Sequence, residues 1–429
     1  EEAVNLSVND LIDETPTDIA FEWTRLIGTT EWDMGDALTT GLDGSIYIAG
    51  QTTHGDLDDQ PNNGETDAFI SKFNSDGTKD WTRLIGTSSG DWAKALTTGL
   101  DGSIYIAGYT AGHLDGHINI GGNGSAAFIS KFNSDGTKDW TRLLGTNYRE
   151  TGTGLTTGID GSIYITGYTF GNLEGQPNNG DSDAFISKFN SEGTKEWTKL
   201  LGTTEFDTGE ALTTGIDGSI YITGYTKGDL DDQPNNGDFD AFISKFNSDG
   251  TKDWTRLLST SSNDYGSALT TGNDGSIYIT GRTFGDLDGE TNNGESDVFI
   301  SKFNSDGTRD WTKLVGTNNY GIAEALTTGI DGSIYIAGLS NDDLYTFISK
   351  FNNDGTKEWT RFLGTPFEDR GSALTTGIDG SIYIAGFTTG DLEGQPNNGS
   401  YDAFISKLTS LFTPTDISLS ATSFYENIS

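Results

Sequence analysis

The chain of 429 residues lacks cysteine, contains one methionine and seven prolines, and carries only 25 lysines and arginines. The lack of cysteine excludes a disulfide framework and thiol chemistry. No apolar stretch is long enough to span a membrane as a helix, and no signal-peptide pattern is present, so membrane insertion is not expected. No window has apolar residues at a spacing of about 3.6. The sequence therefore predicts almost no helix.

The shortage of basic residues also restricts the partners. With 64 aspartates and glutamates, the formal net charge is −39. A field of this sign repels nucleic acid and anionic membrane surfaces and attracts cations. We therefore expect no nucleic-acid partner.

One hexapeptide, Asp-Gly-Ser-Ile-Tyr-Ile, is repeated along the chain. Successive copies are separated by 58, 59, 57, 57, 57 and 48 residues. A period this regular indicates one supersecondary unit copied seven times. The seven copies begin at Asp43, Asp101, Asp160, Asp217, Asp274, Asp331 and Asp379.

Each unit has the pattern of four short strands, which we name a, b, c and d. In the first unit these are residues 37–41, 45–50, 68–73 and 81–86, with Asp-Gly turns between a and b and between c and d. Strand b is apolar on both faces, as expected for a sheet covered on both sides. The pattern predicts an all-β, seven-bladed propeller of four-stranded antiparallel blades. A parallel β-solenoid, the structural alternative, would need shorter rungs.

The two ends of the array complement each other. Residues 21–28 form a lone d strand, and the last copy has a, b and c strands but no d strand after them. The N-terminal strand is therefore predicted to complete the last blade, which removes the open edges. The predicted domains are an N-terminal linker (1–19), the propeller (20–410) and a C-terminal segment (411–429).

The repeats resemble the bacterial SBBP-type propeller repeats. The resemblance rests on the run Asp-Gly-Ser-Ile-Tyr-Ile-Ala-Gly and on the run ending in Asp-Ala-Phe-Ile-Ser-Lys-Phe, as in residues 64–73 and 180–189. It implies the propeller fold and an exported or cell-surface setting, and it brings no catalytic motif. Residues 413–427 resemble the first strand of cadherin-like repeats. Because the chain starts at Glu1, we expect a processed form or a fragment of a larger surface protein, with a monomeric propeller.

The charge is expected on one face of the ring. The repeated framework positions hold 20 bases and 19 acids, which nearly cancel. The d–a and b–c connections hold 36 acids and five bases, and in a propeller these connections share one face. This face, which we name the loop face, is predicted to carry a net charge of −31. Solubility alone would explain such a surface.

The b–c loops also suggest Ca²⁺, the one candidate cofactor. Their carboxylates, amides and carbonyls are the hard oxygen donors that Ca²⁺ prefers, although the spacing is not that of an EF-hand. Two repeats break the pattern: one has Ala126 at the position where the others have an aspartate, and one has a shorter loop. The candidate metal ligands are Asp56, Asp58, Asp67, Asp229, Asp231, Asp240, Asp286, Asp288 and Asp297.

Each d–a connection carries one aromatic residue, in a register that varies between repeats. Aromatic rings beside carboxylates are suited to stacking on sugars or gripping a peptide, although they could equally cap the blade cores. The candidate ligand-binding residues are Trp32, Trp92, Tyr148, Phe206, Tyr265, Tyr320 and Phe367.

The sequence favours a non-catalytic interaction or spacer module that takes a protein or glycan ligand on the loop face. A lectin-like propeller is the alternative. A propeller hydrolase is disfavoured because few arginines lie outside the framework and the repeats are nearly identical. His113 and His117 are a weak metal signal outside a helix.

Overall fold

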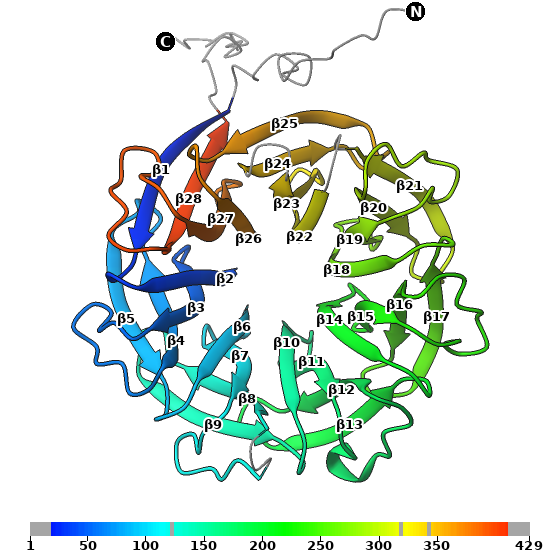
Figure 1. The fold of residues 1–429 in the computed structure, drawn as a ribbon, viewed down its shortest axis with the longest axis horizontal. Helices are drawn as coiled ribbons and strands as arrows, with labels where there is room; N and C mark the ends of the chain where they lie inside the picture. Colours follow the sequence, from blue (N-terminus) through cyan, green and yellow to red (C-terminus); the bar gives the residue numbers. More distant parts are fainter. Residues whose placement is uncertain (1–18, 121–123, 317–320, 341–344, 411–429) are drawn as a thin grey trace, which may run out of the picture.

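The computed structural model describes residues 19–120, 124–316, 321–340 and 345–410. Residues 1–18 of the predicted linker (1–19) and the cadherin-like segment lie outside these ranges, and Ile19 belongs to the first strand of the ring. Within them, 28 strands form seven four-stranded antiparallel sheets around a central channel (Figure 1). No helix among the described residues is long and apolar enough to cross a membrane. The predicted seven-bladed propeller is confirmed.

The blades follow one another along the chain. Blades 1 to 3 consist of β2 (Trp32–Thr40), β3 (Ile46–Thr53), β4 (Thr66–Phe73) and β5 (Lys79–Ile85); β6 (Asp91–Thr98), β7 (Ile104–Thr110), β8 (Ala126–Phe132) and β9 (Lys138–Leu144); and β10 (Glu150–Thr157), β11 (Ile163–Thr169), β12 (Asp183–Phe189) and β13 (Lys195–Leu201). A short 3-10 helix, η2 (Leu173–Gly175), lies in the b–c loop of blade 3.

The remaining blades repeat this order. Blades 4 to 6 consist of β14 (Asp207–Thr214), β15 (Ile220–Thr226), β16 (Asp240–Phe246) and β17 (Lys252–Leu258); β18 (Asp264–Thr271), β19 (Ile277–Thr283), β20 (Asp297–Phe303) and β21 (Arg309–Val315); and β22 (Gly321–Thr328), β23 (Ile334–Ser340), β24 (Tyr345–Phe351) and β25 (Lys357–Leu363). Blade 7 consists of β26 (Asp369–Thr376), β27 (Ile382–Thr388), β28 (Asp402–Ser410) and β1 (Ile19–Ile27).

Blade 7 is closed by the N-terminal strand, as predicted. Strand β1 pairs antiparallel with β28, so that Phe21 lies opposite Leu408 and Ile27 opposite Ala403. The hydroxyls of Thr24 and Ser406 share a buried hydrogen bond of 2.8 Å across this pair. Both described ends of the chain therefore leave the ring at the same blade (Figure 1).

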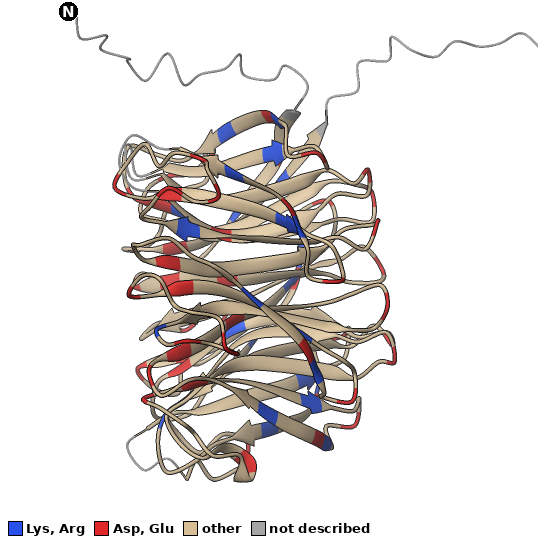
Figure 2. Ribbon diagram, turned by 90° about the vertical axis from the view of Figure 1, so that its right-hand side faces the viewer, with Lys and Arg blue, Asp and Glu red and all other residues tan. Residues whose placement is uncertain are grey.

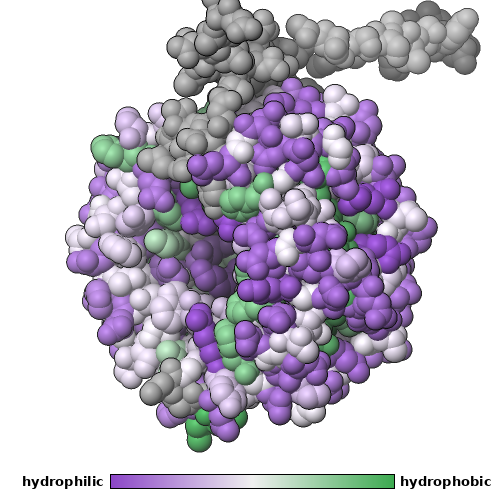
Figure 3. Space-filling view, turned by 45° about the vertical axis from the view of Figure 1, so that its right-hand side comes forward, coloured by the Kyte–Doolittle hydropathy of each residue, from purple (hydrophilic) through white to green (hydrophobic). Residues whose placement is uncertain are grey.

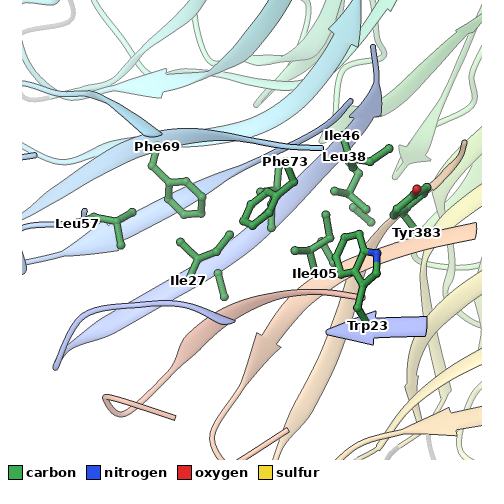
Figure 4. Packing of buried hydrophobic residues seen from close by; sticks show 13 residues of the cluster. Trp23, Ile27, Leu38, Ile46, Leu57, Phe69, Phe73, Tyr383 and Ile405 are labelled. Carbon is green, nitrogen blue, oxygen red and sulfur yellow. The ribbon is translucent and has the colours of Figure 1, made fainter. Parts of the chain in front are cut away.

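The core lies between blades. One cluster combines Trp23 and Ile405 from blade 7 with Ile46 and Phe69 from blade 1, and Leu57 from a b–c loop completes it (Figure 4). Equivalent clusters fill the other contacts between neighbouring blades. Each blade is too thin to enclose a core of its own, so its stability depends on its two neighbours.

The framework tryptophans and lysines connect neighbouring blades. Trp81 packs against Tyr47 of its own blade and donates its indole N–H to the carbonyl of Ser134 in the next blade, at 3.2 Å. Lys72 lies over the same tyrosine ring and forms an ion pair with Asp43 at 3.5 Å. These repeated bases therefore neutralise repeated acids within the framework. Figure 2 shows Lys and Arg mostly along the strands, with acids at both edges of the ring.

The inner strands begin earlier than the sequence suggested. We predicted strand a to start at Ala37, but β2 starts at Trp32 and includes Asp33 and Asp36. The alternation of side chains is interrupted by a β-bulge between Gly35 and Ala37, which hides the strand pattern in the sequence. Part of each connection predicted as loop is therefore the first half of an inner strand.

Candidate functional site

The β-bulge recurs in the inner strand of every blade. In each case one extra residue separates two paired residues, as Lys94 separates Ala93 from Ala95. A bulged residue has no cross-strand partner, so its side chain is free to turn toward the channel. The bulged residues are Asp36, Lys94, Thr153, Glu210, Ser267, Glu324 and Ser372.

Charged bulge residues from neighbouring blades meet in the channel. Lys94 Nζ lies 3.3 Å from Asp36 Oδ2, and the Asp36 carboxylate raises the pKa of Lys94 against the opposing effect of burial. Arg370, near the start of β26, donates Nε–H to Glu324 Oε2 at 2.8 Å and forms a second contact with Oε1. We name Asp36, Lys94, Glu210, Glu324 and Arg370 the channel cluster.

Glu210, a member of the channel cluster, has a raised pKa. Burial raises its pKa to about 7, while the hydroxyl of Thr208 and the charge of Lys94 act in the opposite direction. Its carboxyl group is therefore partly protonated near neutral pH. Figure 3 shows a hydrophilic hollow at the centre of the ring, bordered by small apolar patches.

A line of half-buried aromatic rings, bridged at one point by an arginine, runs along the loop face from blade 2 to blade 5. Trp92 stacks on Tyr109 with ring centroids 4.7 Å apart, and Arg149 lies over both Tyr109 and Tyr168 at about 6 Å. The line continues by ring contacts of 4.9–6.4 Å. We name it the aromatic arc; its rings are Trp92, Tyr109, Tyr168, Phe170, Phe206, Tyr225, Phe239, Tyr265 and Phe284.

Two arginines lie against the arc. Arg149 is exposed, and the Arg282 guanidinium lies 4.6 Å from the ring centroid of Tyr265. Cations over aromatic faces are attracted by the ring quadrupole, which fixes the guanidinium in a defined place. The arc thus presents both flat apolar faces and hydrogen-bond donors.

The seven aromatic residues predicted to bind a ligand lie in different places in the structure. Trp92, Phe206 and Tyr265 belong to the arc. Tyr148 and Phe367 are 61% and 59% exposed on d–a loops. Trp32 packs on Tyr401 in a separate cluster where blade 7 meets blade 1, and Tyr320 lies outside the described residues.

Sequence reasoning missed the arc residues of strand b. Tyr109, Tyr168, Tyr225 and Arg282 each follow the glycine of strand b. This position varies between repeats whereas its neighbours do not, which is the signal that could have found it. The preceding glycine is required because the inner strand comes very close: a Cβ on Gly108 would lie 1.8 Å from the carbonyl oxygen of Trp92.

The aspartates of the b–c loops have separate roles. Asp56 accepts the backbone N–H of Asn62 at 3.1 Å, as Asp229 and Asp286 accept those of Asn235 and Asn292 at 2.9 Å, which closes each loop on itself. Asp58 forms an ion pair with Lys79 on strand d of its own blade. Asp231 and Asp288 make the equivalent contacts with Lys252 and Arg309. The loop aspartates are therefore not brought to a single point.

Asp67, Asp240 and Asp297 lie at the first or second position of strand c and are fully buried. Among the described residues, no three acids or histidines gather around one point suited to a metal ion. Ca²⁺ binding within a single loop stays a prediction.

The predicted charge of the loop face requires a correction. Eleven of the 36 acids assigned to this face have no exposed surface, because they lie inside inner strands or at the start of strand c. The face is still acidic, but about a third of its expected charge is buried between blades. These eleven residues are Asp33, Asp67, Asp91, Glu150, Asp183, Asp207, Asp240, Asp264, Asp297, Asp369 and Asp402.

The fold places the chain among the β-propellers. The sequence model of the SBBP beta-propeller repeat matches residues 80–115 and 196–231, and that of a beta-propeller domain of unknown function matches residues 42–82. The chain carries SBBP-type β-propeller repeats, as the sequence motifs indicated.

Two curated proteins are similar over part of the chain. The regulatory protein FlaEY of Caulobacter vibrioides is 28% identical over 204 residues, which cover 42% of this chain and 21% of that protein. An uncharacterized WD repeat-containing protein, L264, of Acanthamoeba polyphaga mimivirus is 23% identical over 237 residues, 43% of this chain and 17% of that protein. The chain thus corresponds to a small part of each relative.

Among solved structures, the WD40 domain of Neurospora crassa Pan2 is similar with a TM-score of 0.51 and 9% identity, covering 91% of this chain and 95% of that domain. At this identity the likeness shows the fold alone. Propellers serve as enzymes and as binding proteins, so function has to be argued from the site.

Proposed function

We propose that the chain is a non-catalytic recognition module of a larger exported bacterial protein, and that it binds its ligand on the aromatic arc. The observation that carries this proposal is the arc itself. At the same strand positions, blades 1 and 6 carry Met34, Gln51, Ile322 and Leu339. The aromatic residues are therefore not needed to build a blade. Blade 7 carries Phe387 at this position, packed on Tyr401 in the separate cluster with Trp32.

The chemistry of the arc suits a carbohydrate. Sugar rings present flat C–H faces that stack on aromatic side chains, and their hydroxyls accept from guanidinium groups and donate to carboxylates. Arg149, Arg282 and the acidic loops supply those partners beside the rings. A peptide is the second ligand class that such a surface could hold.

The channel cluster supports a non-catalytic role. Lys94 and Arg370 are each engaged by a neighbouring acid, so neither is free to bind an anionic substrate.

A glycan array, read with and without Ca²⁺, tests the proposal, followed by titration of any hit monitored by tryptophan fluorescence. The repeats supply substitutions that the fold already tolerates: Tyr225→Gln copies blade 1, and Tyr265→Ile copies blade 6. Either change should weaken binding at least tenfold. Phe367→Ala, an exposed aromatic outside the arc, is the matched control and should leave affinity unchanged. Equal loss in the control, or no loss in the arc variants, would remove the arc from the site.

A further inference from the structure

The eleven buried carboxylates lie where one blade meets the next, at what we call the joints. Six of them are the first or second residue of an inner strand, and the other five are the first or second residue of a strand c. The eight that the argument below uses (Asp33, Asp67, Asp91, Asp183, Asp207, Asp240, Asp264 and Asp402) form no ion pair with a lysine or arginine in the described part of the chain. Burying a carboxylate without a countercharge is costly, usually by several kcal/mol, so these groups require an explanation.

At four joints two buried carboxylates lie close enough to repel each other by charge. The backbone N–H of Asp207 donates to the carbonyl of Ser182 at 2.8 Å, which places Asp207 beside Asp183 across the joint. In the same way, the backbone N–H of Asp264 donates to the carbonyl of Phe239, which precedes Asp240 in the chain. The four pairs are Asp402 with Asp33, Asp67 with Asp91, Asp183 with Asp207, and Asp240 with Asp264.

The two members of a pair repel each other. Burial raises the pKa of Asp183 to about 6, and the charge of Asp207 contributes to the rise. Asp91 and Asp264 also reach about 6, again through burial and then through the partner carboxylate, against hydrogen bonds that lower the value. The members of a pair act on each other by charge.

Each paired carboxylate uses only one of its oxygens. Asp91 Oδ2 accepts the backbone N–H of Thr87 at 2.7 Å and its hydroxyl at 2.9 Å. Asp67 Oδ2 accepts the N–H of Asn63 at 2.9 Å. The Oδ1 atoms of all eight paired aspartates are buried and form no direct hydrogen bond among the described residues. Nearby hydroxyls still lower the pKa of five of these aspartates; they belong to Thr52, Thr110, Thr226, Thr283 and Ser259. Each of the four paired joints thus holds two buried carboxylate oxygens without a direct hydrogen bond.

The joint between blades 2 and 3 provides an internal comparison. Here Ala126 stands at the strand c position and Glu150 at the inner-strand position. The longer glutamate side chain has both oxygens satisfied: Oε2 accepts the N–H of Thr146 at 2.7 Å, and Oε1 accepts the hydroxyls of Thr146 and Thr169. At this joint the single acid therefore has no unpartnered oxygen, whereas Asp369, the single acid of another joint, keeps a buried Oδ1 without a hydrogen bond.

The other two joints also have one acid each. Asp297 is opposite Gly321, and Asp369 is opposite Tyr345. The seven joints therefore fall into two kinds, four with paired carboxylates and three with a single one.

We propose that each of the four paired joints binds one Ca²⁺ ion between its two carboxylates. Two carboxylate oxygens without a direct hydrogen bond supply the charge that a divalent cation needs, and Ca²⁺ accepts irregular sets of hard oxygen ligands. Since each pair has only two acids, the remaining ligands are neutral. The hydroxyl of Thr110 is one candidate, because it lies beside Asp91 and donates its proton to the carbonyl of Gly112.

One of the paired joints lies beneath a groove of the loop face. A groove lined by Asn179, Gly202, Thr203 and Asp229 lies over the joint between blades 3 and 4. Asn179 and Thr203 donate their backbone N–H groups to Asp183 and Asp207, so the paired carboxylates lie directly beneath the groove. A Cβ on Gly202 would lie 2.3 Å from Asp183 Oδ1, which explains why this position has no side chain. The acidic loops around the groove would concentrate cations at its entrance.

Counting bound ions tests the proposal. The full chain, freed of metal with EDTA, would be titrated with CaCl₂ by calorimetry at constant ionic strength up to about 1 mM, the weak end of protein Ca²⁺ sites, and counted by native mass spectrometry. We expect four ions. The double variant Asp67→Ala with Asp91→Glu copies the joint between blades 2 and 3, and should bind three. The reverse change, Ala126→Asp with Glu150→Asp, creates a fifth pair and should bind five.

A loop variant separates this proposal from Ca²⁺ binding by the b–c loops. Asp56→Asn with Asp58→Asn changes the loop but not the joint, and should still bind four ions. Counts that stay the same in both joint variants, a count that falls in the loop variant, or no binding at about 1 mM would each overturn the proposal. Should the three-site variant fail to fold, the five-site variant decides by itself, because a count that does not rise contradicts the pair as the site.

Discussion

The indole N–H of Trp23 donates to the carbonyl oxygen of Ser75 at 3.2 Å, linking the N-terminal strand of blade 7 to the c–d turn of blade 1. The same bond recurs from blade to blade around the ring. It is not found for Trp359, because blade 7 takes its strand d from the other end of the chain and so has no c–d turn to offer. Trp359 instead lines a cavity of about 240 Å³.

Removing the closing strand should open the ring. Deletion of residues 1–28 removes β1 and leaves β28 as an unpaired edge. We expect aggregation or a large fall in the melting temperature, measured by circular dichroism and light scattering. Deletion of residues 1–18, which keeps β1, is the control and should melt close to the intact chain. Similar behaviour of both truncations would contradict the closure.

The glycine beneath each tryptophan should be sensitive to a methyl group. Gly77 has φ of +79°, and a Cβ there would lie 2.7 Å from Cδ2 of Trp23. Gly116 has φ of +80° with open space around it. Gly116→Ala should cost roughly 1 kcal/mol through backbone strain alone, and Gly77→Ala clearly more. Urea unfolding of the two variants measures the difference; equal costs would mean that the tryptophan contact does not matter.

Without Ca²⁺, the protein should become more stable as the pH falls from 8 toward 5. The paired aspartates have pKa values raised by burial and repulsion, to about 6 in Asp91, Asp183 and Asp264. The native state therefore holds more protons than the unfolded state between pH 4 and 6, and stability is lost as the pH rises through this range. Melting in EDTA at stepped pH should show a rise of a few degrees on acidification.

Asp183→Asn provides the matching variant for the pH dependence. The amide removes one charge and can donate a hydrogen bond to the remaining carboxylate. In EDTA at pH 8 the variant should melt above the parent chain and depend less on pH. A lower melting temperature with an unchanged pH profile would show that the pair is not under electrostatic strain.

Added salt should also stabilise the chain. The exposed acids of the loop face repel one another, and salt screens this repulsion over about 10 Å at 0.1 M. The melting temperature should rise between low salt and roughly 0.5 M NaCl. Ca²⁺ at matched ionic strength should raise it further, because ligands that bind the native state stabilise it. If Ca²⁺ raises the melting temperature no more than NaCl of the same ionic strength, general screening alone explains the rise.

The repeats allowed the ring, the number of blades and the closure to be predicted, because strands b, c and d have clear patterns within a single unit. The first half of strand a was missed, because the glycine-flanked bulge at Asp36 breaks the alternation that marks a strand. The paired carboxylates were missed for another reason. Asp67 and Asp91 are 24 positions apart in two different repeats, and only the packing of blade on blade shows that they meet.

The joints have a consequence for how such a chain can change over time. Ala126 ends one repeat's b–c loop and Glu150 begins the next repeat's inner strand, yet the two substitutions compensate each other at one joint. Each joint is built from the second half of one repeat and the first half of the next, so these two halves must remain compatible with each other. Exchanging or duplicating a whole repeat alters two joints at once, because each repeat contributes to the joint on either side of it. A segment that begins in the middle of one blade and ends in the middle of the next contains both halves of one joint and keeps that joint intact.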